Sequence, residues 1–177
     1  NDIDFHRAMN ETISSIKKAK DNKSIPFAVF KLTGLVKFKI LEKISSNIEL
    51  TEQEEVEKEI FINRIENICK NASDNQVPLF IDAEESWIQT AIDDIALEMM
   101  QRFNKKKALV FNTLQMYRKD RINYLETILE DARKHNYFIG LKLVRGAYHI
   151  QEIERAKQKG YSCPVHIEKI ATDKDYH

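Results

Sequence analysis

The sequence predicts an α/β protein in which parallel strands alternate with helices, and two observations support this prediction. Four short apolar runs are separated by longer segments whose apolar residues recur every three or four positions. None of the four runs alternates apolar with polar residues, a pattern typical of parallel strands covered by helices on both faces. Two architectures remain open from this pattern alone, a doubly wound sheet and part of a β/α barrel.

The first expected elements are a helix and a strand. Residues 3–20 carry apolar side chains on one helical face and end in a lysine-rich turn, where the helix dipole favours cations. Pro26 opens an apolar run at residues 27–32 that is short enough to be a buried strand. Thr33 and Gly34 are expected to end it.

Residues 36–72 are the least regular part of the chain. A short helix is expected at 36–44, a break at 45–47 and a long charged helix at 52–70. A crossover between parallel strands usually needs one helix, so two helices here predict a helical insertion that packs outside the sheet. The acidic start of the second helix is interpreted as a solvated face.

The alternation becomes strict after residue 77. The expected elements are strands at 78–82, 108–112 and 137–144 and helices at 85–103, 119–135 and 149–159, with Gly160 as a helix-ending signal. No strand is followed by G-x-G-x-x-G, so a Rossmann dinucleotide site is not expected.

Composition limits the classes of function. The charge is balanced, with 28 basic and 28 acidic residues, and therefore does not indicate nucleic acid or an anionic membrane as a partner. The two cysteines lie far apart without a C-x-x-C spacing, so neither a metal site nor a disulfide framework is expected, and a reducing intracellular compartment is the default. No segment is apolar enough for a membrane helix.

The chain is expected to be a fragment of a longer one. It starts on Asn1 instead of Met and stops just after an apparent loop. Its 177 residues suffice for a core but not for a whole (β/α)₈ barrel, which typically takes roughly 250 residues.

A charged or polar residue stands at the end of each expected strand. Lys31 ends the first, Asp82 the second, Asn112 the third, and Lys142 with Arg145 the fourth. In β/α folds ligands bind outside the carboxyl ends of the strands, so these groups should converge on one face. A carboxylate, an amide and several cations suit a small zwitterion or a polar cofactor ring.

Each of these residues also has a purely structural interpretation. Lys31 could form an ion pair with Asp82, because a buried lysine without a partner is costly. Glu84 and Glu85 are expected to cap the next helix while Asp82 points inward. The Asn112 amide could bond to neighbouring backbone as readily as to a ligand.

The segment 138–148 is the most distinctive, because an apolar strand runs into a cation, two small residues and an aromatic. Gly146 lets the backbone approach a ligand closely, and two basic residues lie beside it. The structural alternative is a buried strand whose cations merely reach solvent, with Tyr148 as plain packing. Among the histidines, only His149 is expected to face this site.

Several motifs resemble the flavin-dependent proline dehydrogenases. The resemblance rests on Phe80-Ile-Asp-Ala-Glu84, Phe111-Asn-Thr-Leu-Gln115 and Lys142-Leu-Val-Arg-Gly-Ala-Tyr148, followed by Gly160-Tyr-Ser-Cys-Pro164 and Ala171-Thr-Asp173. These motifs occur in order over nearly the whole chain, although the family's catalytic domain is longer.

The resemblance implies that residues 1–177 are part of a distorted (β/α)₈ TIM-type barrel that binds FAD at the carboxyl ends of its strands. The implied reaction transfers a hydride from L-proline to the flavin and gives Δ1-pyrroline-5-carboxylate, with a membrane quinone as the next electron acceptor. A cytoplasmic or peripheral inner-membrane location is implied, mitochondrial in a eukaryote.

The family's first strand would precede Asn1, and three further strands with the substrate-carboxylate clamp would follow His177. The segment alone is therefore expected to be inactive. Its open sheet edges favour a homo-oligomer.

The resemblance also implies roles for individual residues. Asp82 and Lys142 correspond to catalytic residues, and Lys31 and Tyr148 to the substrate site. Cofactor contacts are implied for Ala83, Asn112, Lys142, Val144, Arg145, Gly146 and Ala147. Lys142 would lie beside the reactive flavin nitrogen, where a cation stabilises the negative charge of the reduced ring.

Two other functions remain open. The chain could belong to a Schiff-base aldolase or lyase barrel with Lys31 or Lys142 as the nucleophile. It could also be a non-catalytic scaffold with no ligand of its own.

Overall fold

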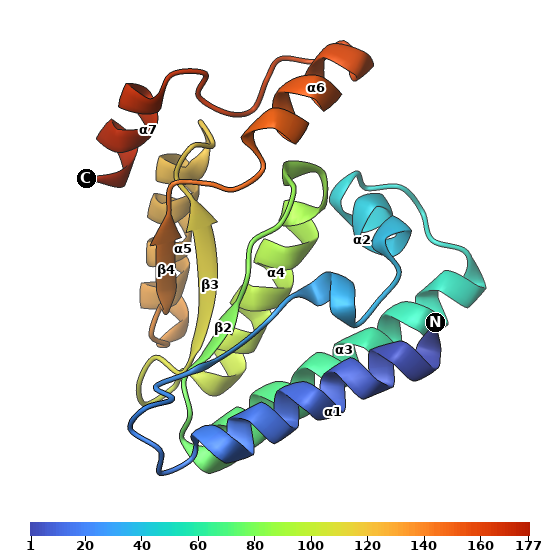
Figure 1. Cartoon of the computed structure of the whole chain (residues 1–177), viewed down its shortest axis with the longest axis vertical. Helices are drawn as coiled ribbons and strands as arrows, with labels where there is room; N and C mark the ends of the chain where they lie inside the picture. Colours follow the sequence, from blue (N-terminus) through green and yellow to red (C-terminus); the bar gives the residue numbers. More distant parts are fainter.

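The computed structural model describes residues 1–177 (Figure 1). The elements are α1 (Asp2–Ala19), β1 (Ala28–Phe30), the 3₁₀ helix η1 (Leu32–Gly34), α2 (Phe38–Ser45), α3 (Glu52–Asn75), β2 (Leu79–Ile81), α4 (Ser86–Phe103), β3 (Val110–Gln115), α5 (Arg121–His135), β4 (Leu141–Val144), α6 (His149–Lys159) and α7 (Lys169–Tyr176). None of the helices is both long and apolar enough to cross a membrane.

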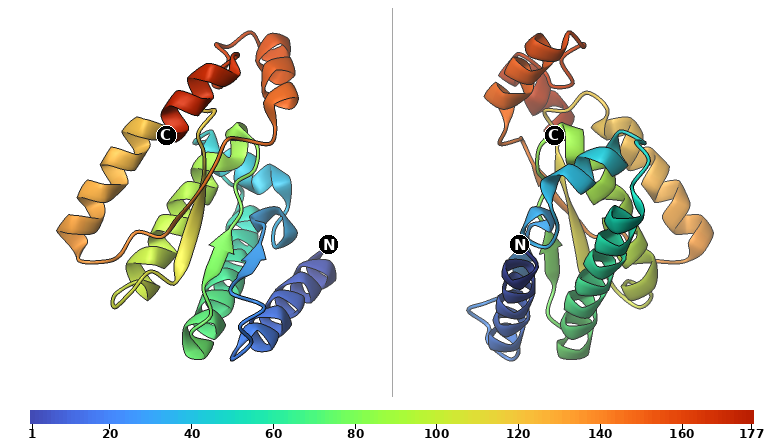
Figure 2. Two further views of the ribbon diagram at one scale, coloured as in Figure 1. Left: turned by 60° about the vertical axis from the view of Figure 1, so that its left-hand side comes forward. Right: turned by 90° about the vertical axis from the view of Figure 1, so that its right-hand side faces the viewer.

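The four strands form one parallel sheet in the order β1-β2-β3-β4. This order runs in one direction along the chain, whereas a doubly wound sheet reverses its direction at a switch point. Helices α3, α4 and α5 lie on the same side of the strands (Figure 2, right). The arrangement confirms the predicted α/β class and its partial β/α barrel form.

Local sequence explains where the main helices begin and end. Asn1 and Asp4 form a capping box at the start of α1, and Thr51 and Glu54 form another at the start of α3. Gly160 ends α6 with a φ of 72°, a left-handed conformation that glycine adopts without steric cost.

One apolar core joins the sheet to the outer helices. A cluster of 29 buried residues draws on α1 to α5 and on the helix-facing side chains of β1, β2 and β3. Ile81 and Val110 are fully buried on this face of the sheet. Side chains alternate along a strand, so the residues next to Ile81 and Val110 on their own strands point to the opposite, inner face.

The inner face carries aromatic side chains and then charged ones. Val29, Phe80 and Phe111 lie side by side in register on three neighbouring strands. The Phe80 and Phe111 rings pack edge to face, with their centres 4.9 Å apart. Positions two residues further along each strand stay on the same face. Lys31 and Asp82 therefore lie above this apolar layer, at the carboxyl edge of the sheet.

Several boundaries differ from the sequence prediction, since β4 begins at Leu141 instead of residue 137 and α3 continues to Asn75 instead of residue 70. Strand β3 spans Val110–Gln115 instead of residues 108–112, because Thr113 to Gln115 continue to pair with β4. The polar Asn112 therefore lies inside the strand and does not end it. Helix α7 was not predicted, since its short segment has no clear apolar periodicity.

Candidate functional site

A pocket of about 300 Å³ opens at the carboxyl edge of the sheet. Eleven residues line it, namely Lys31, Asp82, Ala83, Thr113, Gln115, Lys142, Val144, Arg145, Gly146, Ala147 and Tyr148. Nine of the ten residues that the sequence placed in a site are among them, and the tenth is Asn112. The predicted convergence of the strand ends on one face is therefore present.

Two polar pairs face each other in this pocket. Lys142 donates a hydrogen bond to Asp82 and forms an ion pair with it, and its ammonium lies 5.8 Å from the centre of the Phe80 ring. Lys31 donates to the Tyr148 hydroxyl at 3.0 Å. The alternative ion pair between Lys31 and Asp82 is wrong, because each has a different partner.

Lys31 stays protonated in this setting. Its hydrogen bond to Tyr148 raises its pKa, against a smaller opposite effect of burial, and the charges of Glu84 and Asp82 act in the same direction as Tyr148. A cation is thus held at the end of β1, where an anionic group of a ligand could meet it.

Asn112 lies away from the pocket. Its side chain is 1% exposed, and its amide nitrogen donates to Asp93 Oδ1 of α4 at 2.8 Å. Its amide oxygen accepts a hydrogen bond from the backbone N–H of Thr113 at 2.8 Å. The side chain faces the helix layer, so the structure does not bring it together with the other predicted site residues.

Gln115 and Thr113 were missed by the sequence reasoning. The Gln115 amide oxygen accepts from the Ala147 N–H at 3.0 Å, and its nitrogen donates to the Glu84 carbonyl at 2.8 Å. Both residues share the inner face with Phe111 through strand alternation. A strand continued to residue 115 would have placed them at the site.

The expected capping of α4 by Glu84 and Glu85 is wrong. The Glu84 carboxylate accepts hydrogen bonds from Thr33, whereas Glu85 makes no side-chain cap. The first turn of α4 is capped from α6 instead, since Glu152 accepts from the Ser86 N–H at 2.6 Å and from its hydroxyl at 2.5 Å. This anion at a helix N-terminus matches the helix dipole.

A second pocket of about 230 Å³ adjoins the first, because Arg145 and Gly146 line both. Gly146 has a φ of 140°, and a Cβ built there would lie 2.4 Å from the Tyr117 ring, so only glycine fits. His149 and Lys169 line this second pocket. His149 therefore lies beside Arg145 and Gly146 in the adjoining pocket and does not line the Asp82 pocket itself.

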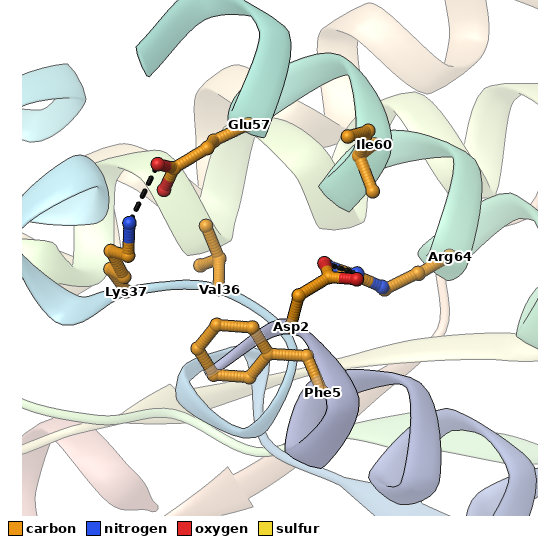
Figure 3. A pocket seen from close by; sticks show the side chains of 7 residues that line it. All are labelled: Asp2, Phe5, Val36, Lys37, Glu57, Ile60 and Arg64. Carbon is orange, nitrogen blue, oxygen red and sulfur yellow. Dashed lines mark hydrogen bonds and ion pairs between the residues drawn. The ribbon is translucent and has the colours of Figure 1, made fainter. Parts of the chain in front are cut away.

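Another pocket lies outside the sheet, between α1, α3 and the segment before α2 (Figure 3). Phe5 and Ile60 contribute apolar lining. Its charges are already matched, since Arg64 pairs with Asp2, and Lys37 pairs with Glu57 at 2.6 Å. This pocket thus offers no free charge to a ligand and shares no lining residue with the pocket at the strand ends.

The fold and the first pocket define a β/α-barrel domain with a charged pocket at the carboxyl ends of its strands. The family model described as "Proline dehydrogenase" matches residues 1–177, and the chain belongs to the proline dehydrogenase family.

Curated relatives agree with this assignment. The chain is 46% identical over 124 residues to proline dehydrogenase 1, mitochondrial, of Drosophila melanogaster, covering 68% of this chain and 18% of that protein. The human protein of the same name is 40% identical over 127 residues, covering 72% of this chain and 21% of that protein. The carbapenem antibiotics biosynthesis protein CarD of Pectobacterium carotovorum is 31% identical over 173 residues, covering 98% and 45%.

Solved structures share the fold. Proline utilization A from Bdellovibrio bacteriovorus, inactivated by N-propargylglycine, superposes with a TM-score of 0.81 and 20% identity, covering 99% of this chain and 19% of that one. The chain spans less than half the length of each of these relatives.

Proposed function

We propose that the protein containing this chain oxidises L-proline to Δ1-pyrroline-5-carboxylate and that FAD accepts the hydride. The observation that carries the proposal is the pair of contacts at the strand ends, Asp82 with Lys142 and Lys31 with Tyr148, in a chain of this family. The names of the curated relatives support the same substrate.

The residues of the pocket suit a flavin. Lys142 and Arg145 supply positive charge, and the small residues Ala83, Gly146 and Ala147 leave room for a ring to approach the backbone. Bound FAD would supply the electron acceptor of the reaction. Lys142 would stabilise negative charge on the reduced ring, and Asp82 keeps Lys142 in position. The Val144 side chain would form part of the wall of the flavin pocket. Asn112 would act only indirectly, by holding strand β3 in place.

The substrate side of the pocket is assigned to Lys31 and Tyr148. The Lys31 ammonium would bind the proline carboxylate, because a cation near an anionic group supplies charge-assisted hydrogen bonds. Tyr148 would border the pyrrolidine ring and hold Lys31 through its hydroxyl. Loss of a hydride from the carbon beside the ring nitrogen to FAD, together with loss of a proton from that nitrogen to solvent, would leave the product imine.

The second pocket would hold the phosphates of FAD. Arg145 joins the two pockets, and Lys169 adds a second cation. Both pair with Asp173 in this structure, so the phosphates would take the place of that carboxylate. Cations of this kind are the usual partners of phosphate groups.

The wider setting is also proposed. Electrons would leave the flavin for a membrane quinone, on the inner membrane of mitochondria in a eukaryote. The names of several relatives support only the mitochondrial location. Residues 1–177 alone would lack turnover, since only Lys31 here meets the substrate carboxylate. The open edges at β1 and β4 favour a homo-oligomer.

Flavin absorbance and proline-dependent dye reduction by the purified protein test this function. Asp82→Ala should keep the fold and lose most turnover, because Lys142 loses its partner. A colourless protein that FAD cannot reconstitute would contradict the assignment, and unchanged proline kinetics in Asp82→Ala would contradict the role of Asp82.

The Schiff-base alternative is less well supported. A lysine must lose its proton before it can act as a nucleophile. Lys142 pairs with the Asp82 carboxylate, which favours the protonated form. The pKa of Lys31 is raised, mainly by its hydrogen bond to Tyr148. Borohydride trapping of a carbonyl substrate on either lysine would revive that alternative. Absence of flavin together with a stable oligomer would favour a scaffold.

A further inference from the structure

A belt of hydrogen bonds connects the carboxyl ends of all four strands. Thr33, after β1, donates its backbone N–H and its hydroxyl to the Glu84 carboxylate at 3.2 and 2.7 Å. Gln115, at the end of β3, donates to the Glu84 carbonyl at 2.8 Å and accepts from the Ala147 N–H at 3.0 Å. Glu84 is the member of this belt that binds two other strand ends.

Glu84 is also a charged group in an unusual place. It is only 4% exposed, and its own N–H is bound by Gln89 at 2.8 Å, so the residue is fixed on all sides. Burial raises its pKa, while the Thr33 hydrogen bonds and the Lys31 charge oppose that rise and Glu85 adds to it. Taking a carboxylate out of water is costly unless a cation or donors compensate it.

The hydrogen bonds alone do not require a negative charge. A neutral amide at position 84 could accept from the Thr33 N–H and donate to its hydroxyl, which is both donor and acceptor. A negative charge attracts a cation, and the charge of Glu84 acts on Lys31, which lies two residues before Thr33 in the chain. The 3₁₀ turn that carries Thr33 begins directly after Lys31.

We propose that Glu84 is a positioning residue whose hydrogen bonds fix the turn after β1 and whose negative charge directs the Lys31 ammonium toward the substrate carboxylate. Only the identity of that carboxylate, namely that of L-proline, rests on the proposed function. Glu84 reaches the substrate through Lys31 and does not touch it.

Steady-state kinetics of the whole protein test this role with Glu84→Gln and the matched control Glu85→Gln, the neighbouring carboxylate without a side-chain cap. Glu84→Gln should raise the KM for proline about tenfold and change kcat by less than about twofold, with an unchanged flavin spectrum. Glu85→Gln should match the parent protein. An unchanged KM in Glu84→Gln would overturn the proposal.

A double-mutant cycle separates positioning from a general structural role. If Glu84 acts through Lys31, the Glu84→Gln change should have no further effect on KM in a Lys31→Met background. Additive effects of the two substitutions would instead mean that Glu84 supports the pocket independently of Lys31.

A measurement on Lys31 itself keeps the proposal testable without turnover. The groups that act on the Lys31 ammonium are Tyr148, Glu84 and Asp82. Titration of Lys31 through its ¹³Cε chemical shift should show a lower pKa in Glu84→Gln and no change in Glu85→Gln. An unchanged Lys31 titration would overturn the positioning role, whereas a parent protein without flavin and proline oxidation would overturn only the proposed function.

Discussion

The outer helices and the two C-terminal helices are attached to the sheet by different forces. Helices α1, α3 and α4 bury apolar side chains in the 29-residue core. Helix α6 buries only Glu152 and Ala156, and α7 buries only Thr172. The fold is therefore stabilised by burial in one region and by polar contacts in the other.

The polar contacts of α6 and α7 reach the candidate site. Glu152 caps α4, and Arg155 stacks over the Trp87 ring with its guanidinium carbon 4.3 Å from the ring centre. Asp173 of α7 accepts from Arg145, which lines the pocket. Hydrogen bonds contribute less net free energy than an apolar core and respond to pH and salt. The pocket should thus be perturbed under milder conditions than the sheet.

The largest expected effect concerns a buried ion pair between α4 and α5. Asp93 binds Arg121 at 2.7 Å, and both side chains are about 5% exposed or less. Asp93→Ala would remove one of the two carboxylates that bind Arg121, the other being Asp120, and would leave the buried amides of Asn112 and Gln89 without their acceptor. We expect a loss of about 3–5 kcal/mol in the free energy of unfolding, measured from urea curves. The exposed neighbour Asp94 provides the control, since Asp94→Ala should change the free energy of unfolding by less than about 0.5 kcal/mol.

Ile65→Ala tests the apolar core directly. Ile65 of α3 is fully buried, so truncation leaves a cavity as well as losing buried area. We expect a loss of about 3 kcal/mol, again from urea unfolding. Val56 of the same helix is 56% exposed, and Val56→Ala should cost less than about 0.5 kcal/mol. Equal losses at the two positions would contradict the division into a buried and an exposed face.

The sequence was sufficient for the elements whose signals are local. Strand and helix alternation follows from apolar spacing, and the strand-end residues Lys31, Asp82 and Lys142 do converge. Spacing alone left the barrel and the doubly wound sheet unresolved, and only the resemblance favoured the barrel. The observed strand order then distinguishes them.

The errors arose where a polar residue is satisfied by a distant partner. Asn112 resembled a strand end, but its partner Asp93 lies on the preceding helix. Glu84 resembled a helix cap, but its partner Thr33 lies 51 positions earlier in the chain. A single sequence gives no information about such pairings, because they depend on how the sheet brings its loops together.

Glu152→Gln should loosen α6 without affecting the core. The substitution removes the negative charge at the start of α4 and keeps a similar shape, so we expect α6 opening to become easier by about 1 kcal/mol. Hydrogen exchange of the α6 amides measures this opening, and the α3 amides should be unchanged. Glu154→Gln, an exposed position on the same helix, is the control. Faster exchange throughout the protein would show that Glu152 belongs to the global core.

The smallest expected effect is the attachment of α7 through Asp173. Hydrogen bonds from Lys169 and then from Arg145 lower the pKa of Asp173 to about 2. A carboxyl group with a depressed folded pKa stabilises the folded state above its unfolded pKa of 3.8, and this contribution is lost as the pH falls toward 2.

The resonances of Tyr176, whose ring packs 4.3 Å from the Arg145 guanidinium carbon, should therefore shift over this acid range. Asp173→Asn should remove the pH dependence and leave α7 loosened already at neutral pH. Because the contact is partly exposed, high salt should weaken it as well. A Tyr176 signal that follows the unfolding of the sheet at every pH would show that α7 is held by the core and not by its charges.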